Sequence, residues 1–149
     1  MLRFSMETGV MNTDNKMCNI SLTSSMEDYL EAVLVLQQKH GYIRCVDVAG
    51  YLGVTKPSVS RAVKELSKKK CLLKKDDGTL SLTEQGRQIA QQIYEKYQFF
   101  TKQLIEAGVP RDIAVQDACR LEHVISETSF NKLKEAAWMK AQEVIPSEK

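Results

Sequence analysis

The chain has 149 residues and a formal net charge of +2, a length that allows one or two small domains with a compact core. No apolar run approaches the roughly 18 residues of a membrane-spanning helix, and the N-terminus lacks the hydrophobic region of a signal peptide. The four cysteines are widely spaced and form no Cys-x-x-Cys pair, which argues against a disulfide scaffold or a zinc knuckle and favours the reduced cytoplasm.

Residues 1–20 are polar and methionine-rich, without helical or strand periodicity, and we expect them either to form a disordered tail or to lie upstream of the true start, for which Met6, Met11, Met17 and Met26 are candidates. The pattern Ser24-x-x-Glu27 is typical of a capping box at a helix start. Apolar residues then recur on one helical face until about Lys39, and Gly41 is predicted to end this first helix.

Two short helices and a hairpin are predicted next. Residues 46–52 form a helix that Gly53 ends, and Pro57 stands at the first position of the following helix, where its missing N–H is harmless. That helix runs to about Lys68. Two strand-like runs then flank Asp76-Asp77-Gly78, which is typical of a β-hairpin turn.

The remainder of the chain is predicted to be helical. Thr83 caps a long helix that reaches about Ala107, where Gly108-Val109-Pro110 breaks it. Two more helices follow, over about 111–125 and 127–144. Because no repeat or low-complexity segment interrupts this order, we expect the long helix to join two domains directly.

Two helices that are joined by a tight glycine-containing turn and followed by a hairpin describe a winged helix-turn-helix. The predicted fold is therefore mainly α, with a winged helix-turn-helix domain at 21–85 and an all-helical dimerisation domain at 86–149. Positive charge is concentrated in the first of these, since residues 40–87 carry a net charge of +5. This segregation indicates a surface for the phosphates of double-stranded DNA.

In such a motif the second helix enters the major groove with its N-terminal end. Hydroxyl and basic side chains there can bond base edges or phosphates, and the lysines of the wing add affinity for the backbone without sequence preference. The predicted DNA-binding residues are Lys56, Pro57, Ser58, Ser60, Arg61, Lys64, Lys74 and Lys75. Two other interpretations stay open, namely a solvated lysine-rich helix face and a winged helix that binds protein.

A second group of polar residues stands on a later predicted helix. Cys119, Glu122 and His123 occupy positions i, i+3 and i+4, so they are expected to share one helix face. Thiolate, carboxylate and imidazole are all ligands of divalent transition metals. Asp28 and Glu31 form an acidic pair on the first helix that could complete the same coordination sphere. The simpler explanation is an ordinary helix surface and first-turn acids favoured by the helix dipole.

Four segments together carry the pattern of a known family. They are Ser25-Met26-Glu27-Asp28-Tyr29-Leu30-Glu31, the helix-turn-helix at 46–66, Leu82-Thr83-x-x-Gly86, and Ala118-Cys119-Arg120-Leu121-Glu122-His123-Val124-Ile125-Ser126. In this order they resemble the diphtheria toxin repressor / manganese transport regulator family. The similarity covers about residues 24–135, and the Cys-Arg-x-Glu-His segment is its most specific part.

This resemblance implies a homodimeric repressor of metal-ion homeostasis, with an N-terminal DNA-binding domain and a helical dimerisation domain. It implies that Fe²⁺ or Mn²⁺ acts as co-repressor between the two domains. Asp28, Glu31, Glu122 and His123 match ligands of the manganese branch, whereas Cys119 matches a ligand of the iron branch.

Two departures from the family pattern make the expected site a hybrid. Tyr97 stands where the manganese branch has a ligand histidine, and a neutral phenol is a poor ligand for Mn²⁺. Asp28 stands where the iron branch has a methionine. We therefore expect one mixed site with Glu31 as its weakest member. Fe²⁺ is the first choice, because it accepts both thiolate and carboxylate ligands.

The dimer surface is expected on the last two helices. Its apolar area would come from Phe130, Leu133, Ala137 and Trp138. The alternative for any single apolar helix face is that it packs inside its own chain.

Two other classes of function stay open. One is a metal-independent winged-helix regulator that senses a small molecule or the oxidation of Cys119. The other is a small metalloenzyme, which we do not expect because the chain lacks His-Glu-x-x-His and any setting for a catalytic triad.

Overall fold

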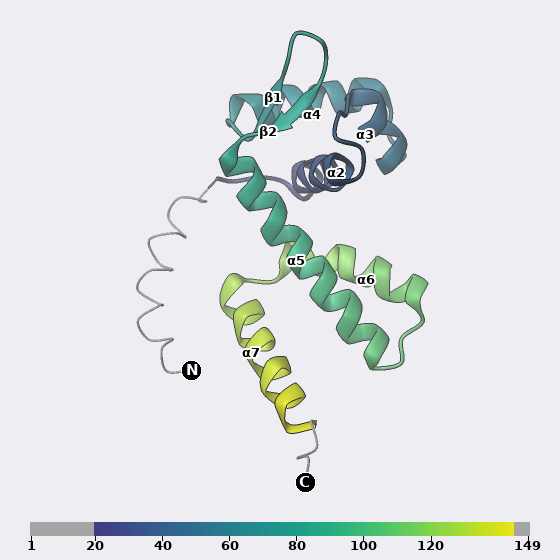
Figure 1. Ribbon diagram of the computed structural model, residues 1–149, viewed down its shortest axis with the longest axis vertical. Helices are drawn as coiled ribbons and strands as arrows, with labels where there is room; N and C mark the ends of the chain where they lie inside the picture. The colour runs from purple at the N-terminus through teal and green to yellow at the C-terminus, as the bar shows by residue number, and fades with distance from the viewer. Residues whose placement is uncertain (1–19, 145–149) are drawn as a thin grey trace. The chain divides into compact units, whose positions relative to one another are not determined.

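The computed structural model describes residues 20–144, so the tail predicted for residues 1–20 lies almost entirely outside the described part. These residues form two compact units that divide between Gln92 and Ile93. Figure 1 labels the helices α2 to α7 and the strands β1 and β2 in chain order. The predicted mainly α fold is confirmed. None of the described helices is both long and apolar enough to cross a membrane.

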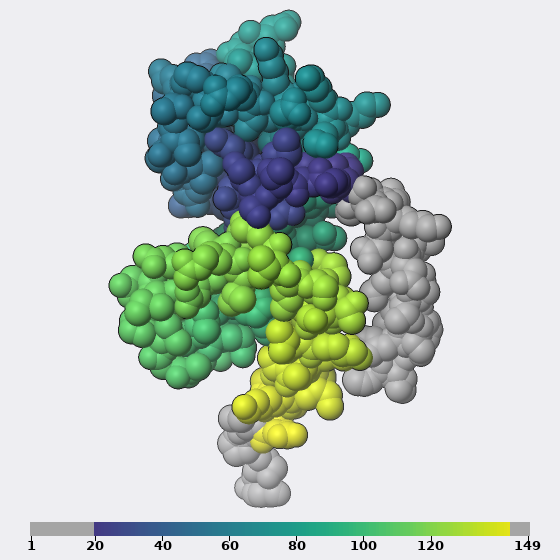
Figure 2. All heavy atoms as spheres, turned by 180° about the vertical axis from the view of Figure 1, so that it is seen from behind, coloured from purple at the N-terminus to yellow at the C-terminus, as the bar shows by residue number. Residues whose placement is uncertain are grey.

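The first unit is built around α2 (Ser24–His40). Residues 29–36 of this helix are buried apart from the half-buried Glu31, because α3, α4 and β2 all pack against it. In Figure 2 the purple atoms of α2 lie against the blue atoms that follow them in the chain. The helix begins after Thr23, whose Oγ1 accepts the backbone N–H of Met26 at 3.2 Å. The predicted capping box at Ser24 is therefore wrong by one residue, since Ser24 is already helical.

Helices α3 (Cys45–Leu52) and α4 (Lys56–Lys68) form the helix-turn-helix. The chain turns between them at Gly53, which adopts a left-handed φ of 70° that glycine tolerates at no steric cost. Thr55 caps α4, and Pro57 is the second helical residue rather than the predicted first. Its missing N–H is still harmless there, because the first turn has no intrahelical partner for it.

The wing is a two-stranded antiparallel hairpin of β1 (Leu72–Lys74) and β2 (Leu80–Leu82), with Leu72 opposite Leu82. Gly78 turns the chain between the strands with a φ of 89°. The backbone N–H of Leu80 also donates to the carbonyl of Ile43 at 2.8 Å. This bond ties the hairpin to the loop between α2 and α3, which a hairpin of three-residue strands needs for stability.

The long helix α5 (Glu84–Glu106) starts directly after the wing. The predicted cap Thr83 is confirmed, since its Oγ1 accepts the N–H of Gly86 at 3.0 Å and donates to the carbonyl of Lys70 at 2.7 Å. Gly86 lies against the backbone of Cys71, where a Cβ would stand 1.9 Å from the carbonyl oxygen. This contact explains the glycine in Leu82-Thr83-x-x-Gly86.

The second unit contains the rest of α5 from Ile93 onward, α6 (Arg111–Val124) and α7 (Glu127–Val144). Its core forms where Phe100, Ala118 and Phe130 meet. The Lys96 ammonium and the Glu127 carboxylate, 2.8 Å apart, add an ion pair between α5 and α7. The bounds of these helices agree with the sequence predictions to within one or two residues. The domain boundary at 85 stays a prediction, because the two compact units divide inside α5.

Candidate metal centre and DNA-binding surface

Helix α6 carries a carboxylate on its buried face. The buried residues of this helix are Ala114, Ala118 and Glu122, which follow one another at intervals of four and so lie on one line. The first two are small and apolar, and Ala118 packs against the phenylalanines of the core. Glu122 thus occupies a position where packing alone would favour another apolar residue. A buried charge is costly unless a counter-charge accompanies it, so this position favours a functional role.

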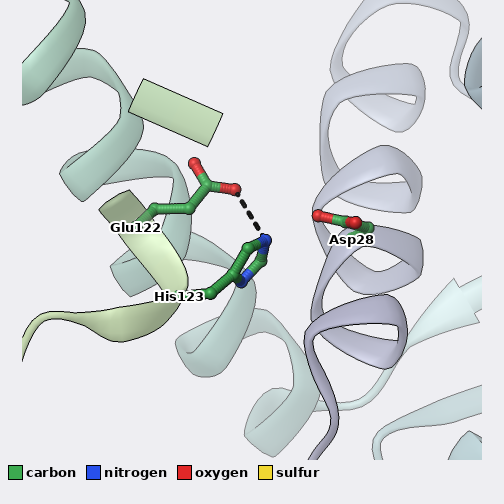
Figure 3. Close-up of side chains that lie close together, drawn as sticks. All are labelled: Asp28, Glu122 and His123. Atoms are coloured by element: carbon green, nitrogen blue, oxygen red, sulfur yellow. Dashed lines mark ion pairs between the residues drawn. The ribbon is translucent and has the colours of Figure 1, made fainter. Parts of the chain in front are cut away.

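The imidazole of His123 lies beside this carboxylate. His123 Nε2 and Glu122 Oε1 are 3.4 Å apart, and the two side chains are only 8% and 1% exposed. Figure 3 shows the pair on α6 with the ion pair dashed. A carboxylate oxygen and an imidazole nitrogen, enclosed together, form a donor pair that suits Mn²⁺, Fe²⁺ or Zn²⁺. The chemistry of these two side chains therefore fits a divalent metal ion.

Cys119 lies in a different environment from Glu122. Its side chain is exposed, whereas the Glu122 side chain is buried. The next residue, Arg120, is also exposed and pairs with Asp117. Spacing of three residues leaves two side chains about 60° apart around a helix, which is enough to place one inside and one outside. The thiol is thus presented to solvent at the edge of the buried face.

The remaining residues of the predicted metal site belong to other helices than α6. Asp28 and Glu31 belong to the first two turns of α2 in the first unit, and both are half-buried; Figure 3 also draws Asp28. Tyr97 belongs to α5 in the second unit, where its ring stacks on Tyr94 with centroids 6.1 Å apart and packs against the core cluster. Tyr97 therefore serves as a packing residue, and the ligand role of the two acids stays a prediction.

The N-terminal part of α4 presents the basic and hydroxyl side chains that the sequence predicts for DNA. Ser58 is half-buried, and its hydroxyl is 2.9 Å from Thr55 Oγ1 and 3.4 Å from an Arg61 guanidinium nitrogen. This network ties the Arg61 side chain, in the second turn of the helix, to Ser58 in the first turn. The exposed residues here are Lys56, Pro57, Ser60, Arg61 and Lys64. The face that packs inward is formed by Val59, Val63 and Leu66, with Ala62 half-buried.

The turn of the wing is charged, and Arg44, which lies near it, was not predicted from the sequence. Lys74 and Lys75 are exposed, as a role at phosphates requires. The Asp77 carboxylate accepts the backbone N–H of Thr79 at 2.9 Å; this bond lowers the pKa of Asp77, and the charges of Arg44 and Lys75 lower it further. The pattern Asp-Gly-Thr could have indicated this side-chain turn, but nothing in the sequence placed Arg44 beside it.

Two family descriptions match consecutive parts of the sequence. Residues 21–77 match "Iron dependent repressor, N-terminal DNA binding domain", and residues 83–137 match "Iron dependent repressor, metal binding and dimerisation domain". The chain belongs to the iron-dependent repressor family. The resemblance to the diphtheria toxin repressor / manganese transport regulator family is thus confirmed, and with it the function of a metal-dependent transcriptional repressor.

Individual relatives support the same assignment. The HTH-type transcriptional regulator MntR of Geobacillus kaustophilus is 32% identical over 111 residues, which make up 74% of this chain and 79% of that protein. Among solved structures, the manganese regulator SloR has a TM-score of 0.68 and 26% identity over 75% of this chain. The metal-dependent transcriptional regulator MtsR has a TM-score of 0.71 and 25% identity over 78%. This chain spans only 53% and 54% of the lengths of those two structures.

Proposed function

We propose that this repressor family member responds to Fe²⁺ or Mn²⁺ and controls genes of metal-ion homeostasis by binding a double-stranded operator as a homodimer. The observation that carries this proposal is the enclosed pair of Glu122 and His123, whose side chains are 1% and 8% exposed. A divalent cation compensates the cost of enclosing a carboxylate in such a place. The fraction of protein that holds the ion at this site then depends on the cellular concentration of the metal.

The proposed ligands are Asp28, Glu31, Cys119, Glu122 and His123. Carboxylates favour the harder ions Mn²⁺ and Fe²⁺, whereas a thiolate favours Fe²⁺, Co²⁺ and Zn²⁺ over Mn²⁺. SloR, one of the similar structures, is described as a manganese regulator, which supports Mn²⁺. The cysteine supports Fe²⁺, and the exposure of its thiol leaves the choice between the two ions to experiment.

The proposed ligands come from both units, and this distribution suggests how metal controls DNA binding. Asp28 and Glu31 belong to α2 of the DNA-binding unit, and the other three belong to α6. In this proposal Asp28 and Glu31 would hold a divalent cation together with the ligands on α6, and its charge would offset that of their carboxylates. Without it, the acidic groups repel one another and the two recognition helices of a dimer lose their fixed separation. Only the fixed separation matches two half-sites on one face of DNA, so metal binding shifts the population toward the competent form.

For operator recognition we propose that the start of α4 reads the major groove. Arg61 is exposed there and can pair bidentately with guanine, which is the commonest base-specific contact of an arginine. Lys56, Ser60 and Lys64 surround it, and Pro57 and Ser58 shape the turn that presents them. Lys74 and Lys75 on the wing would bind phosphates.

For the dimer surface we propose the exposed apolar residues of α7. Leu133 and Trp138 are 45% and 60% exposed, and Ala137 between them is half-buried. Phe130, which the sequence also suggested for the interface, is only 1% exposed because it fills the core of its own unit. It therefore has no surface to offer a partner and supports α7 from inside.

The experiment is operator binding measured by fluorescence anisotropy under anaerobic conditions, with DNA selected from a random pool in the presence of metal. The chelated protein is titrated with Mn²⁺, Fe²⁺, Co²⁺ and Zn²⁺ in separate series. We expect Mn²⁺ or Fe²⁺ to restore binding. In the variant Glu122→Gln the metal concentration for half-maximal binding should rise by at least about tenfold.

Three further variants complete this test. Asp28→Asn should also weaken the metal response, Cys119→Ser should shift the preference from Fe²⁺ toward Mn²⁺, and Glu143→Gln on the exposed end of α7 should behave as wild type. Operator binding that resists chelator would contradict the proposal. If such binding were then lost on peroxide treatment, the result would favour a regulator that senses the oxidation of Cys119.

A further inference from the structure

The turn of the wing lies against the start of α3. A hollow of about 440 Å³ between them is lined by Tyr42, Arg44, Asp47, Asp77 and Thr79. Gly78 stands at the tip of the turn, and a Cβ at this position would lie 3.8 Å from Nε and 3.9 Å from Cδ of Arg44. These are ordinary van der Waals distances, so the Arg44 side chain packs over the tip of the wing.

Arg44 is itself held at the start of α3. Its backbone is extended, with φ −130° and ψ 175°, and it occupies the capping position before Cys45. Its N–H donates to Asp47 Oδ2 at 2.8 Å, which is the backward half of a capping box. Because the Asp47 carboxylate fixes this backbone, it also fixes the direction in which the Arg44 side chain leaves the chain.

The other side of the hollow is ordered by Asp77. Its carboxylate closes the turn by accepting the Thr79 N–H at 2.9 Å. That hydrogen bond, and then the nearby charges of Arg44 and Lys75, keep the pKa of Asp77 below its usual range. The carboxylate is thus ionised at neutral pH and attracts the guanidinium that lies over Gly78.

The wing depends on such an attachment because its strands are short. Each has three residues, and an isolated hairpin of this length is marginal at best. At its base the Leu80 N–H bonds to the Ile43 carbonyl, and at its tip Arg44 packs over Gly78. The direction of the tip decides where the exposed Lys74 and Lys75 stand relative to the recognition helix.

We propose that Arg44 is a positioning residue for DNA binding, which keeps the tip of the wing in the orientation that brings Lys74 and Lys75 to the phosphates. This inference rests on the proposed role of the wing in operator binding. In this role Arg44 does not contact DNA itself, and its effect on affinity depends on Lys74 and Lys75.

The salt dependence of operator affinity separates these two roles. Each phosphate contact contributes a slope of about 0.9 in log affinity against log salt, or on the order of tenfold at 0.1 M salt. Each substitution is present in both subunits of the dimer, so a direct contact would make Arg44→Gln lower the slope by at most about 1.8. A positioning role should lower it by about 3.6, since both wing contacts are lost in each subunit. Arg44→Lys, which keeps the stem and the charge, should restore most of the affinity.

A double-mutant cycle provides the second readout. In wild type, changing Lys74 and Lys75 together to Gln should weaken binding by well over tenfold, but in the Arg44→Gln background the same change should cost less than about twofold. The control is Lys68→Gln, an exposed cation at the far end of α4 whose effect should be the same in both backgrounds.

All variants are compared as full chains with metal present, after thermal unfolding shows that they are folded. Additive effects of Arg44 and the two lysines would overturn the positioning role. A slope change of about 1.8 or less in Arg44→Gln would overturn it as well. If wild type itself showed no metal-dependent operator binding, the proposed function would fail instead, so the two failures are distinguishable.

Discussion

Gly86 stands inside α5, where helix propensity alone would favour alanine by about 1 kcal/mol. The structure gives the opposite expectation, because a Cβ at this position would lie 1.9 Å from the carbonyl oxygen and 2.8 Å from the carbonyl carbon of Cys71. Both atoms belong to the backbone and cannot rotate away. Gly86→Ala should therefore push the start of α5 off the hairpin and lower the free energy of unfolding by about 2–3 kcal/mol. Urea denaturation followed by circular dichroism measures this.

Gly50 in α3 provides the matched control for Gly86. It is also helical, but outside its own helix backbone and chain neighbours no atom of the described residues would lie within 4 Å of its Cβ. Gly50→Ala should therefore follow propensity and raise the free energy of unfolding by about 1 kcal/mol. Equal effects of the two substitutions would show that the close approach to Cys71 does not decide the outcome.

The metal-site residues show what spacing alone can predict. The sequence placed Cys119, Glu122 and His123 together on one helix, and α6 does carry all three. It could not predict that Glu122 would be buried while Cys119 is exposed. That difference depends on which side of α6 meets the core around Phe130, and this is decided by packing between helices rather than by the local pattern.

Among the elements, helix ends were predictable where the signal is local. Gly41 and Gly53 end their helices because both adopt a positive φ, and Thr83 caps α5 through its own side chain. The start of α2 was misplaced because Thr23 and Ser24 are both good capping residues and only the backbone geometry distinguishes them. The contact of Arg44 with the wing was missed because it joins residues more than thirty positions apart.

The wing turn should also respond to pH through Asp77. Its pKa in the folded protein is lowered, first by the bond from the Thr79 N–H and then by Arg44 and Lys75. Ionised Asp77 therefore contributes stability that is fully present above the unfolded pKa of about 3.9 and is lost as the pH falls through the lower folded pKa. Asp77→Asn keeps an acceptor for Thr79 but removes the charge.

Two measurements test this prediction. Titration of the Asp77 carboxyl carbon by NMR should give a midpoint below 3.8, and Arg44→Gln should raise it. Thermal unfolding should show wild type more stable than Asp77→Asn at pH 7, with a difference that shrinks below pH 4. A midpoint at or above the ordinary value would contradict the arrangement of the turn.

At the scale of the whole molecule, the apolar residues of α7 divide into two groups that the sequence could not separate. Phe130 points into its own unit, where its ring meets those of Phe99 and Phe100. Trp138 and Met139 are more than half exposed. Figures 1 and 2 both show the yellow C-terminal half of α7 projecting away from α6. A helix pattern predicts an apolar face, but it does not say whether the same chain or a second copy covers it.

The matched family description assigns dimerisation to residues 83–137. Trp138 is exposed directly after this range, so we expect a substitution there to weaken the dimer. Trp138→Glu places a charge on an apolar surface that a partner would bury, so a partner would have to desolvate it. We expect Trp138→Glu to be monomeric at micromolar concentration in analytical ultracentrifugation, with its fold intact because Trp138 is 60% exposed in the single chain.

Operator binding should fall together with the dimer, since one recognition helix reads only one half-site. Thr128→Glu adds the same charge at an exposed position in the first turn of α7, where the helix dipole favours an acid, and it should remain dimeric. If Trp138→Glu stayed dimeric and bound its operator like wild type, the contact between subunits would have to lie on another surface. The exposed Val124 on α6 would then be the next position to change.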